Sequence, residues 1–381
     1  MFTRFFLLLC SLILLVSCST SKDNTEPPAP LVKLTPTLTL KTLWTANTGA
    51  DVDKDFLKLI PTIYENQLYT ASSAGHLRIF NLTDGKLIRE YKIDISISGG
   101  PGVGEELILV GSPKGEVVAL SEKDGTELWR IQLSSEILAV PRINQGVVVV
   151  RTLDGKLFGI DSKNGNRLWV YESRVPLLTL RGTSSPILYQ DFIFAGFDNG
   201  KIVVLELDTG KVRWEYAVAV ARGRTELERM VDIDADPLLI NDMLYVTSYQ
   251  GPTIAIDMRK GKLLWKKKLS SYAGIGADYD YLYVSDTQGH LWALDRYSGK
   301  DWWKQEKLQA RHLTAPVSIG DYVVVGDFEG YLHWMRRDDG QFLTRYQIDK
   351  ASIKMPPLVV NDMLIAYNIE GKIVALQPES K

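Results

Sequence analysis

Beyond the N-terminal region, short runs of apolar and polar residues alternate and are separated by turn-forming residues. A representative stretch contains four runs whose β-branched, aromatic or alternating side chains are typical of strands, at residues 237–240, 243–249, 253–257 and 263–269. The segments between these runs contain asparagine or glycine, which suit tight hairpins because they tolerate a positive φ. The pattern predicts a four-stranded antiparallel sheet.

This four-strand pattern recurs along the chain, with a glycine at the same place in every copy. The first glycine of each copy occurs at intervals of 38 to 51 residues: Gly75, Gly115, Gly155, Gly200, Gly251, Gly289, Gly330 and Gly371. A second glycine follows ten residues after each of the first seven, and a proline stands fourteen residues before the first glycine in seven copies. Eight such repeats predict an all-β fold, an eight-bladed β-propeller of four-stranded antiparallel blades.

The ends of the chain predict how the ring closes. The eighth copy stops before its fourth strand, because its second glycine would fall at the last residue, Lys381. Residues 40–44 have the composition of that missing strand, and Trp44 matches a tryptophan found near the end of most copies. We therefore expect an N-terminal strand to complete the last blade, so that the propeller spans residues 40–381 and has no open seam.

A tryptophan stands four residues after the second glycine in five copies, at Trp129, Trp169, Trp214, Trp265 and Trp303. Arg89 and Thr344 replace it in two others. Because these rings recur at one structural position, we expect them to pack against the neighbouring blade, with an aromatic ligand cage as the alternative. The surrounding segments, 119–129, 159–169, 255–265 and 293–303, resemble the tryptophan-docking motif of quinoprotein-type eight-bladed propellers.

The N-terminus is typical of an exported, lipid-anchored protein. Residues 1–17 contain Arg4 followed by an apolar stretch of twelve residues, too short to span a bilayer, and are predicted to be a signal peptide. The sequence Leu-Val-Ser-Cys ending at Cys18 resembles the bacterial lipobox, which implies cleavage before Cys18 and lipidation of that residue; ordinary cleavage leaving a free thiol is the alternative. Ser19 in the next position implies the outer membrane, facing the periplasm. Residues 18–39 are rich in proline and threonine and are predicted to be a tether of up to about 70 Å.

Composition excludes several functions for the folded body. A net charge of −2 gives no general attraction to nucleic acid, and the only cysteines are Cys10 and Cys18. The propeller therefore has neither disulfide nor thiol nucleophile. The four histidines fall in different copies, and we expect them at blade edges rather than in a metal site.

Lipobox, tether and eight blades together resemble the BamB family, the lipoproteins of the outer-membrane β-barrel assembly machine. Two connections between copies are unusually long, and they lie in neighbouring copies, so we expect them to be close in space. By resemblance, a Leu-x-Leu-Arg stretch and an Asp-x-Asp stretch in these connections bind the periplasmic domains of the barrel-forming subunit, BamA. The matching residues are Leu178, Leu180, Arg181, Asp232 and Asp234. The resemblance also implies a role beside unfolded outer-membrane proteins, whose strands could pair with an exposed blade edge.

Three alternatives stay open at this point. The two leucines could simply extend a strand while Arg181 pairs with an acid of its own chain. The protein could be a quinone-dependent dehydrogenase, although adjacent cysteines are absent and the acids at 232–236 are followed by Pro237 where a calcium loop needs glycine. It could also be a propeller that binds a glycan or small ligand in its central funnel. No catalytic residues, metal or cofactor can be assigned, and we expect a non-enzymatic periplasmic scaffold.

Overall fold

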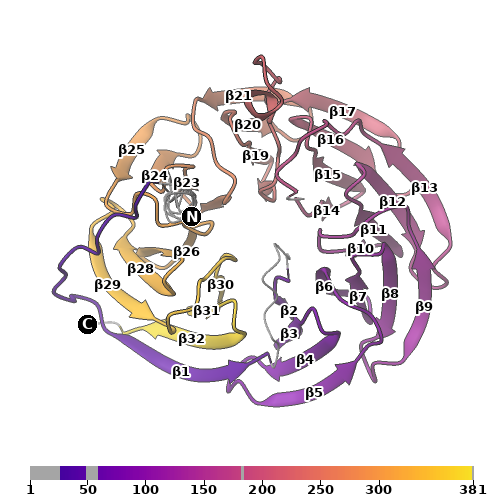
Figure 1. Ribbon diagram of the computed structural model, residues 1–381, viewed down its shortest axis with the longest axis horizontal. Coiled ribbons are helices and arrows are strands. Elements are labelled where there is room, and N and C mark those ends of the chain that lie inside the picture. The colour runs from indigo at the N-terminus through magenta and orange to yellow at the C-terminus, as the bar shows by residue number, and fades with distance from the viewer. Residues whose placement is uncertain (1–25, 49–58, 182–183, 380–381) are drawn as a thin grey trace, which may run out of the picture.

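The structure is a computed structural model that describes residues 26–48, 59–181 and 184–379. Within these residues, eight four-stranded antiparallel sheets are arranged as a closed ring (Figure 1). The predicted eight-bladed propeller is confirmed. One short 3₁₀ helix, Leu227–Arg229, is the only helix among the described residues.

Each blade is a sheet of four strands, and the order of the strands in the sheet goes from the centre of the ring to its rim. Blade 1 consists of β2 (Thr62–Tyr64), β3 (Gln67–Ala71), β4 (His76–Asn81) and β5 (Leu87–Lys92). Blade 2 consists of β6 (Gly99–Gly104), β7 (Leu107–Gly111), β8 (Glu116–Ser121) and β9 (Glu127–Gln132). Blade 3 consists of β10 (Arg142–Asn144), β11 (Val147–Arg151), β12 (Lys156–Asp161) and β13 (Arg167–Glu172). Blade 4 consists of β14 (Ile187–Tyr189), β15 (Phe192–Gly196), β16 (Lys201–Glu206) and β17 (Val212–Ala217).

The second half of the ring repeats this order. Blade 5 consists of β18 (Leu238–Ile240), β19 (Met243–Thr247), β20 (Thr253–Asp257) and β21 (Lys262–Lys267). Blade 6 consists of β22 (Ile275–Ala277), β23 (Tyr281–Ser285), β24 (Leu291–Asp295) and β25 (Asp301–Gln305). Blade 7 consists of β26 (Val317–Ile319), β27 (Tyr322–Gly326), β28 (Tyr331–Arg336) and β29 (Phe342–Gln347). Blade 8 combines β30 (Leu358–Val360), β31 (Met363–Tyr367) and β32 (Lys372–Pro378) with β1 (Leu40–Asn47).

The ring closes where the two ends of the chain meet. Strand β1 pairs antiparallel with β32 from Leu40 opposite Pro378 to Asn47 opposite Lys372. Figure 1 shows the indigo β1 running beside the yellow β32. The N-terminal strand thus completes blade 8, as the sequence predicted, and it extends three residues beyond Trp44.

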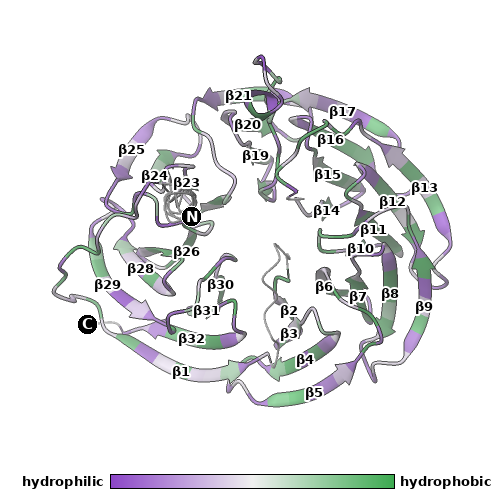
Figure 2. Ribbon diagram, viewed as in Figure 1, coloured by the Kyte–Doolittle hydropathy of each residue, from purple (hydrophilic) through white to green (hydrophobic). Residues whose placement is uncertain are grey.

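The second strand of each blade is largely apolar, because neighbouring blades cover both of its faces. In β11 the residues Val148, Val149 and Val150 are fully buried. Outer strands instead alternate, since one face packs inward and the other meets solvent. Figure 2 shows mostly green on inner strands such as β15 and β16 and mixed colours on outer strands such as β13 and β17. The core is therefore a series of inter-blade clusters rather than one central mass.

The recurring tryptophans join each blade to the next. Trp265 of blade 5 is buried, and its Nε1 donates to the carbonyl oxygen of Arg296 in blade 6 at 2.9 Å. Its ring lies on Gly299, where an added Cβ would stand 2.6 Å from Cε3. Trp44 makes the same pair of contacts with the carbonyl of Leu82 and with Gly85. The packing role expected for these side chains is confirmed.

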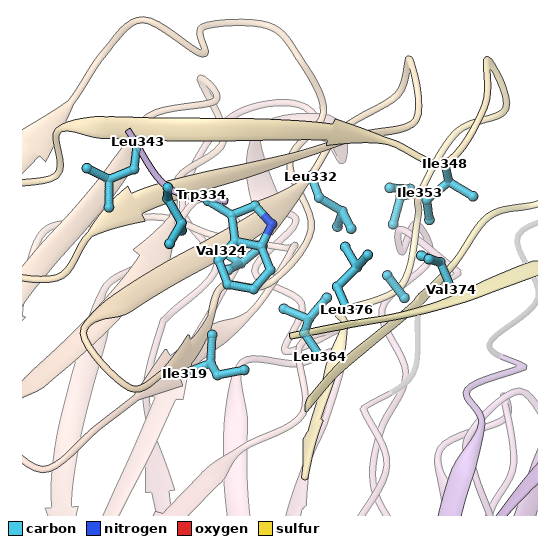
Figure 3. Close-up of a cluster of buried hydrophobic side chains, with 12 residues drawn as sticks. Ile319, Val324, Leu332, Trp334, Leu343, Ile348, Ile353, Leu364, Val374 and Leu376 are labelled. Atoms are coloured by element: carbon cyan, nitrogen blue, oxygen red, sulfur yellow. The ribbon is translucent and has the colours of Figure 1, made fainter. Parts of the chain in front are cut away.

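The two blades without this tryptophan contact the next blade through other side chains. Arg89 of blade 1 donates from Nη1 to the carbonyls of Glu122 and Lys123 in blade 2, at 2.8 and 2.7 Å. Between blades 7 and 8, where Thr344 takes the position, the fully buried Trp334 fills the interface from the preceding strand. Figure 3 shows this ring facing Leu364 and Leu376 of blade 8.

The structure differs from the expectation for the predicted tether. The segment between Ala29 and Leu38 lies against blades 6 and 7, with Leu38 buried, rather than extending freely. Its apolar residues find a surface on the ring, which composition alone does not reveal. The predicted signal peptide and Cys18 lie outside the described residues, and no helix among the described residues is long and apolar enough to cross a membrane.

Candidate functional site

The two long connections predicted to bind a partner are joined to each other. One links β13 to β14, and the other links β17 to β18. The backbone N–H of Leu180 in the first donates to Oδ2 of Asp232 in the second. A second bond joins the same connections, from the N–H of Ser185 to Oδ1 of Asp236 at 2.6 Å. The expected proximity of the two connections is confirmed, and side-chain carboxylates of one hold the backbone of the other.

The leucines of the first connection face solvent. Leu178 is 42% exposed and Leu180 38% exposed. Leu177, which the sequence analysis did not select, is 92% exposed, more than any other large hydrophobic side chain among the described residues. Three apolar side chains within four positions, held outward by a fixed backbone, form an apolar projection of the kind that anchors protein interfaces.

Arg181 pairs with an acid of its own chain. Its Nη2 donates to both carboxylate oxygens of Glu136, at 2.9 and 3.0 Å. Glu136 belongs to the connection between blades 2 and 3, so this ion pair spans neighbouring inter-blade connections. The Arg181 side chain nevertheless stays 53% exposed. The intramolecular alternative is therefore present in the structure, and it leaves a large part of the guanidinium accessible.

Asp232 does not face solvent. The residue is fully buried. Its carboxylate accepts the Leu180 N–H, and its backbone carbonyl accepts from the N–H of Tyr249 at 2.9 Å. Burial raises the pKa of its carboxyl to about 6, and the nearby Asp198 adds to this rise, while the Leu180 N–H and Arg151 oppose it. The expectation of a direct partner contact through this side chain does not fit the geometry, because Asp232 supports the Leu180 backbone from beneath.

A buried ion pair lies under the two connections. Arg151 of blade 3 and Asp198 of blade 4 are both almost fully buried, with Nη2 and Oδ1 2.6 Å apart. Arg151 also donates to the carbonyl and hydroxyl oxygens of Ser184, at the end of the first connection. The exposed leucines are thus carried on a rigid base, since breaking such a buried pair is costly.

Asp234, the last of the predicted residues, is half-buried and lines a central cavity of about 990 Å³. Leu180 and Arg181 line the same cavity, together with aromatic side chains of other blades: Tyr249, Tyr272 and Phe328. The predicted residues therefore divide into three groups. Leu178 is exposed outside the cavity, the partly exposed Leu180 and Arg181 line the cavity with Asp234, and Asp232 is a buried support.

Glu136 was missed by the sequence analysis, although the repeat contains a signal for it. Glu136, Arg181 and Asp232 each stand nineteen residues before the first glycine of their repeat. The same position is taken by Arg311 in blade 7. Aligning the copies at this position would have grouped these charged residues.

The histidines depart from the sequence-based expectation. His333 is fully buried, with Nε2 2.8 Å from Oδ2 of the buried Asp327. His290 is also buried and contacts Asp286. The prediction that the histidines lie at blade edges is wrong for His333, which lies within β28 and bonds a buried aspartate; His290 lies beside its turn as predicted but is buried. No group of three or more potential metal ligands occurs in the part of the chain that the structure describes.

The ring of eight blades joined by docked tryptophans defines a quinoprotein-like β-propeller. A family model described as "Outer membrane protein assembly factor BamB" matches residues 92–305. The chain is 42% identical over 369 residues to the protein of that name from Pseudomonas aeruginosa, covering 97% of both chains, and 39% identical over 374 residues to that of Kangiella koreensis, covering 98% and 96%. The chain belongs to the BamB family.

Solved structures agree with this assignment. The crystal structure of BamB from Moraxella catarrhalis matches with a TM-score of 0.81 at 27% identity, covering 89% of this chain and all of that one. Quinohemoprotein alcohol dehydrogenase from Comamonas testosteroni matches with a TM-score of 0.70 at 14% identity, which shows a shared fold alone. Since near-full-length relatives are named as assembly factors and the dehydrogenases are similar only in fold, the expectation of a non-enzymatic protein is confirmed.

Proposed function

We propose that this protein is a lipid-anchored scaffold on the periplasmic face of the outer membrane, where it docks BamA and assists the insertion of β-barrel proteins. Its relatives are named as outer membrane protein assembly factors, which supports the general role. The docking surface consists of Leu177, Leu178, Leu180 and Arg181. Asp232 and Asp236 act beneath it as positioning residues.

The observation that carries this proposal is an apolar projection with a restrained backbone. Loops normally expose polar side chains, and a large exposed apolar cluster marks an interaction site. The carboxylates of Asp232 and Asp236 restrain the projecting connection before any partner arrives. A preorganised loop loses little conformational entropy on binding, so more of the contact energy stabilises the complex.

Arg181 would add a charged rim to the apolar centre. With its guanidinium half exposed beside Glu136, Arg181 can donate to a second carboxylate, from a partner, while keeping its bonds to Glu136. The role of the ring is then positional, since holding flexible periplasmic domains in one orientation lowers the entropy cost of assembling barrel subunit, substrate and membrane.

The test is the affinity of the full chain for the BamA periplasmic domains, with melting temperature measured in parallel. Leu178→Ala, Leu180→Ala and Arg181→Glu should each weaken binding by about 1 to 3 kcal/mol. Leu128→Ala on β9 is the matched control, since Leu128 is 52% exposed but lies on an outer strand away from the connections. Loop variants that melt normally and bind as tightly as this control would show that the docking surface lies elsewhere.

The central cavity supports a second candidate, a ligand-binding propeller. Aromatic side chains line it, as expected for a site that takes a glycan or small molecule. Equilibrium dialysis against soluble cell-wall fragments tests this function. Binding that is lost in Tyr272→Ala and kept in Leu128→Ala would favour it, and absence of binding would exclude cell-wall fragments as the ligand.

A further inference from the structure

The segment 26–39, which we call the strap, is attached along the rim of the ring at blades 6 and 7. At its start, Oε1 of Glu26 accepts from Nε2 of Gln309, and the N–H of Ala29 donates to the Gln309 carbonyl at 2.9 Å. Near its end, the N–H of Thr37 donates to the carbonyl of Leu343 on β29 at 2.9 Å. The strap therefore crosses blade 7 before it enters β1, and Figure 1 shows it in indigo outside β29.

The strap occupies a site built from buried charge. Arg311 is 2% exposed and donates from Nε to Asp327 at 2.8 Å, from Nη2 to Glu329, and from Nη1 to the carbonyl of Ala29 at 3.0 Å. A second arginine, Arg345, donates to the carbonyl of Val32 at 2.8 Å. Since a buried guanidinium needs partners for its N–H groups, the strap completes the hydrogen bonding of Arg311.

Apolar contacts add to this attachment. Val32 and Leu34 pack against the cluster between blades 6 and 7, and Leu38 is buried in the cluster between blades 7 and 8. Leu343, just before the tryptophan position of blade 7, is only 8% exposed, whereas the equivalent Leu128 of blade 2 is 52% exposed. The strap therefore covers an apolar position that stays open on another blade.

This attachment sets how far the ring can move from a lipid at Cys18. Glu26 follows Cys18 by eight residues, which span at most about 30 Å when fully extended. An unattached tether reaching to Leu40 would span about 75 Å. Docking of the strap thus shortens the tether by more than half and fixes which part of the rim it leaves from.

The surface of blade 6 suits a membrane interface. The only tyrosine and tryptophan side chains more than half exposed in the described residues all belong to blade 6: Tyr279, Tyr297 and Trp302. Amphipathic aromatic rings favour the boundary between lipid headgroups and water. Gln309, where the strap begins, lies four residues after the outer strand of blade 6, at the end of the blade where the N–H of Ala310 donates to the carbonyl of Gln288. The rings lie toward the other end, where the N–H of Arg296 donates to the carbonyl of Asp280, so the strap and the rings flank the rim of this blade.

We propose that the strap orients the ring with the rim of blades 6 and 7 toward the bilayer. The connections that carry Leu180 and Asp232 lie in the half of the ring opposite blade 7 (Figure 1), and Leu180 lines the central cavity, so both connections would stay clear of the membrane-facing rim. This inference rests on the lipid anchor of the proposed function. The interaction surface is the blade 6 and 7 rim, and its partner is the lipid surface itself.

Energy transfer from a labelled site to headgroup-labelled lipid tests the orientation. Because the chain has no cysteine after Cys18, a cysteine introduced into the lipidated protein is the single labelling site. Lys307→Cys places a donor dye near the start of the strap, and Glu172→Cys places one at the end of β13 on the opposite rim; both positions are exposed. In phosphatidylethanolamine and phosphatidylglycerol vesicles, transfer should be several-fold stronger from position 307 than from position 172.

Releasing the strap should abolish this difference. Ala29→Pro removes the N–H that bonds Gln309, and Leu34→Asp places a charge against the apolar cluster; the matched control is Thr35→Asp, at an exposed neighbouring position. The double variant should equalise transfer from the two sites, and the control should preserve the difference. Protein that fails to float with the vesicles would contradict the lipid anchor and the orientation together. Protein that floats with equal transfer from both sites in the otherwise unmodified chain would contradict the orientation alone.

Discussion

The contact between a tryptophan and the glycine of the next blade gives the sharpest test of what holds the ring together. At Gly299 an added Cβ would stand 2.6 Å from Cε3 and 2.7 Å from Cδ2 of Trp265, and φ is +69°. Gly299→Ala therefore combines two costs. Backbone strain contributes about 1 to 2 kcal/mol, and displacing the packed ring contributes about 1 to 3 kcal/mol more.

Gly320→Ala separates these costs, because its backbone is similar but its surroundings are empty. Gly320 has φ +54°, and a Cβ there would meet nothing within 4 Å. This variant should lose only the strain, about 1 to 2 kcal/mol. The difference between the two glycine variants then measures the contact with the tryptophan.

Trp265→Ala, alone and combined with Gly299→Ala, completes the double-mutant comparison. It removes a side chain that is only 8% exposed, together with its hydrogen bond to the Arg296 carbonyl, and should cost about 3 to 5 kcal/mol. In that background Gly299→Ala has no ring to displace, so its additional cost should fall to that of Gly320→Ala. Urea unfolding of the four proteins measures each free energy. Equal costs for Gly299→Ala with and without Trp265 would refute the interlocking of ring and glycine.

Three further outcomes follow from the structure. Deleting residues 19–47 removes the strap and β1, whereas deleting residues 19–36 removes part of the strap and leaves β1 in place. The longer deletion should destabilise the ring far more. Equal melting temperatures for the two deletions would contradict closure of the ring through β1. Because the pKa of the Asp232 carboxyl is raised from 3.8 to about 6, the folded chain binds this proton more tightly than the unfolded chain, and stability should fall by about 2 to 3 kcal/mol as pH rises from about 4 to 6. Asp232→Asn should flatten this pH dependence. Denaturant midpoints that change with pH equally in the variant and the unmodified chain would exclude Asp232 as its source. Cys18→Ala should remove the protein from the membrane fraction, and its retention after a high-salt wash would contradict lipid as the main anchor.

The fold could be predicted from the sequence because its determinants recur. Turn glycines, strand-opening prolines and docking tryptophans repeat at fixed spacing, and the unfinished eighth copy identifies the closing strand. The spacing of the repeats could not show whether a residue outside the repeated strands is buried or exposed. Asp232 lies in an irregular connection that folds under its neighbour, and nothing in Asp-x-Asp distinguishes a buried support from an exposed contact.

Long-range partners account for the other differences. His333 is buried because Asp327, six residues earlier, faces the same pocket with Arg311. The strap has the proline-rich composition of a tether, yet Arg311 and Arg345 bond its carbonyls from 282 and 313 residues away in the sequence. Such contacts depend on how the closed ring brings blade 7 back to the N-terminus, and no local pattern encodes them.

Repeat equivalence offers a way to find functional residues in such a ring. Packing constrains the glycines and tryptophans, which therefore vary little between blades. The side chain at the position nineteen residues before the first glycine differs from blade to blade, and Asp232 and Arg311 at this position are buried among polar groups. There, Arg181 and Glu136 form the ion pair at the candidate docking surface, while Arg311 binds the strap on the opposite side of the ring. One repeat position therefore supplies both attachments, and the residue type at that position decides what each connection contacts.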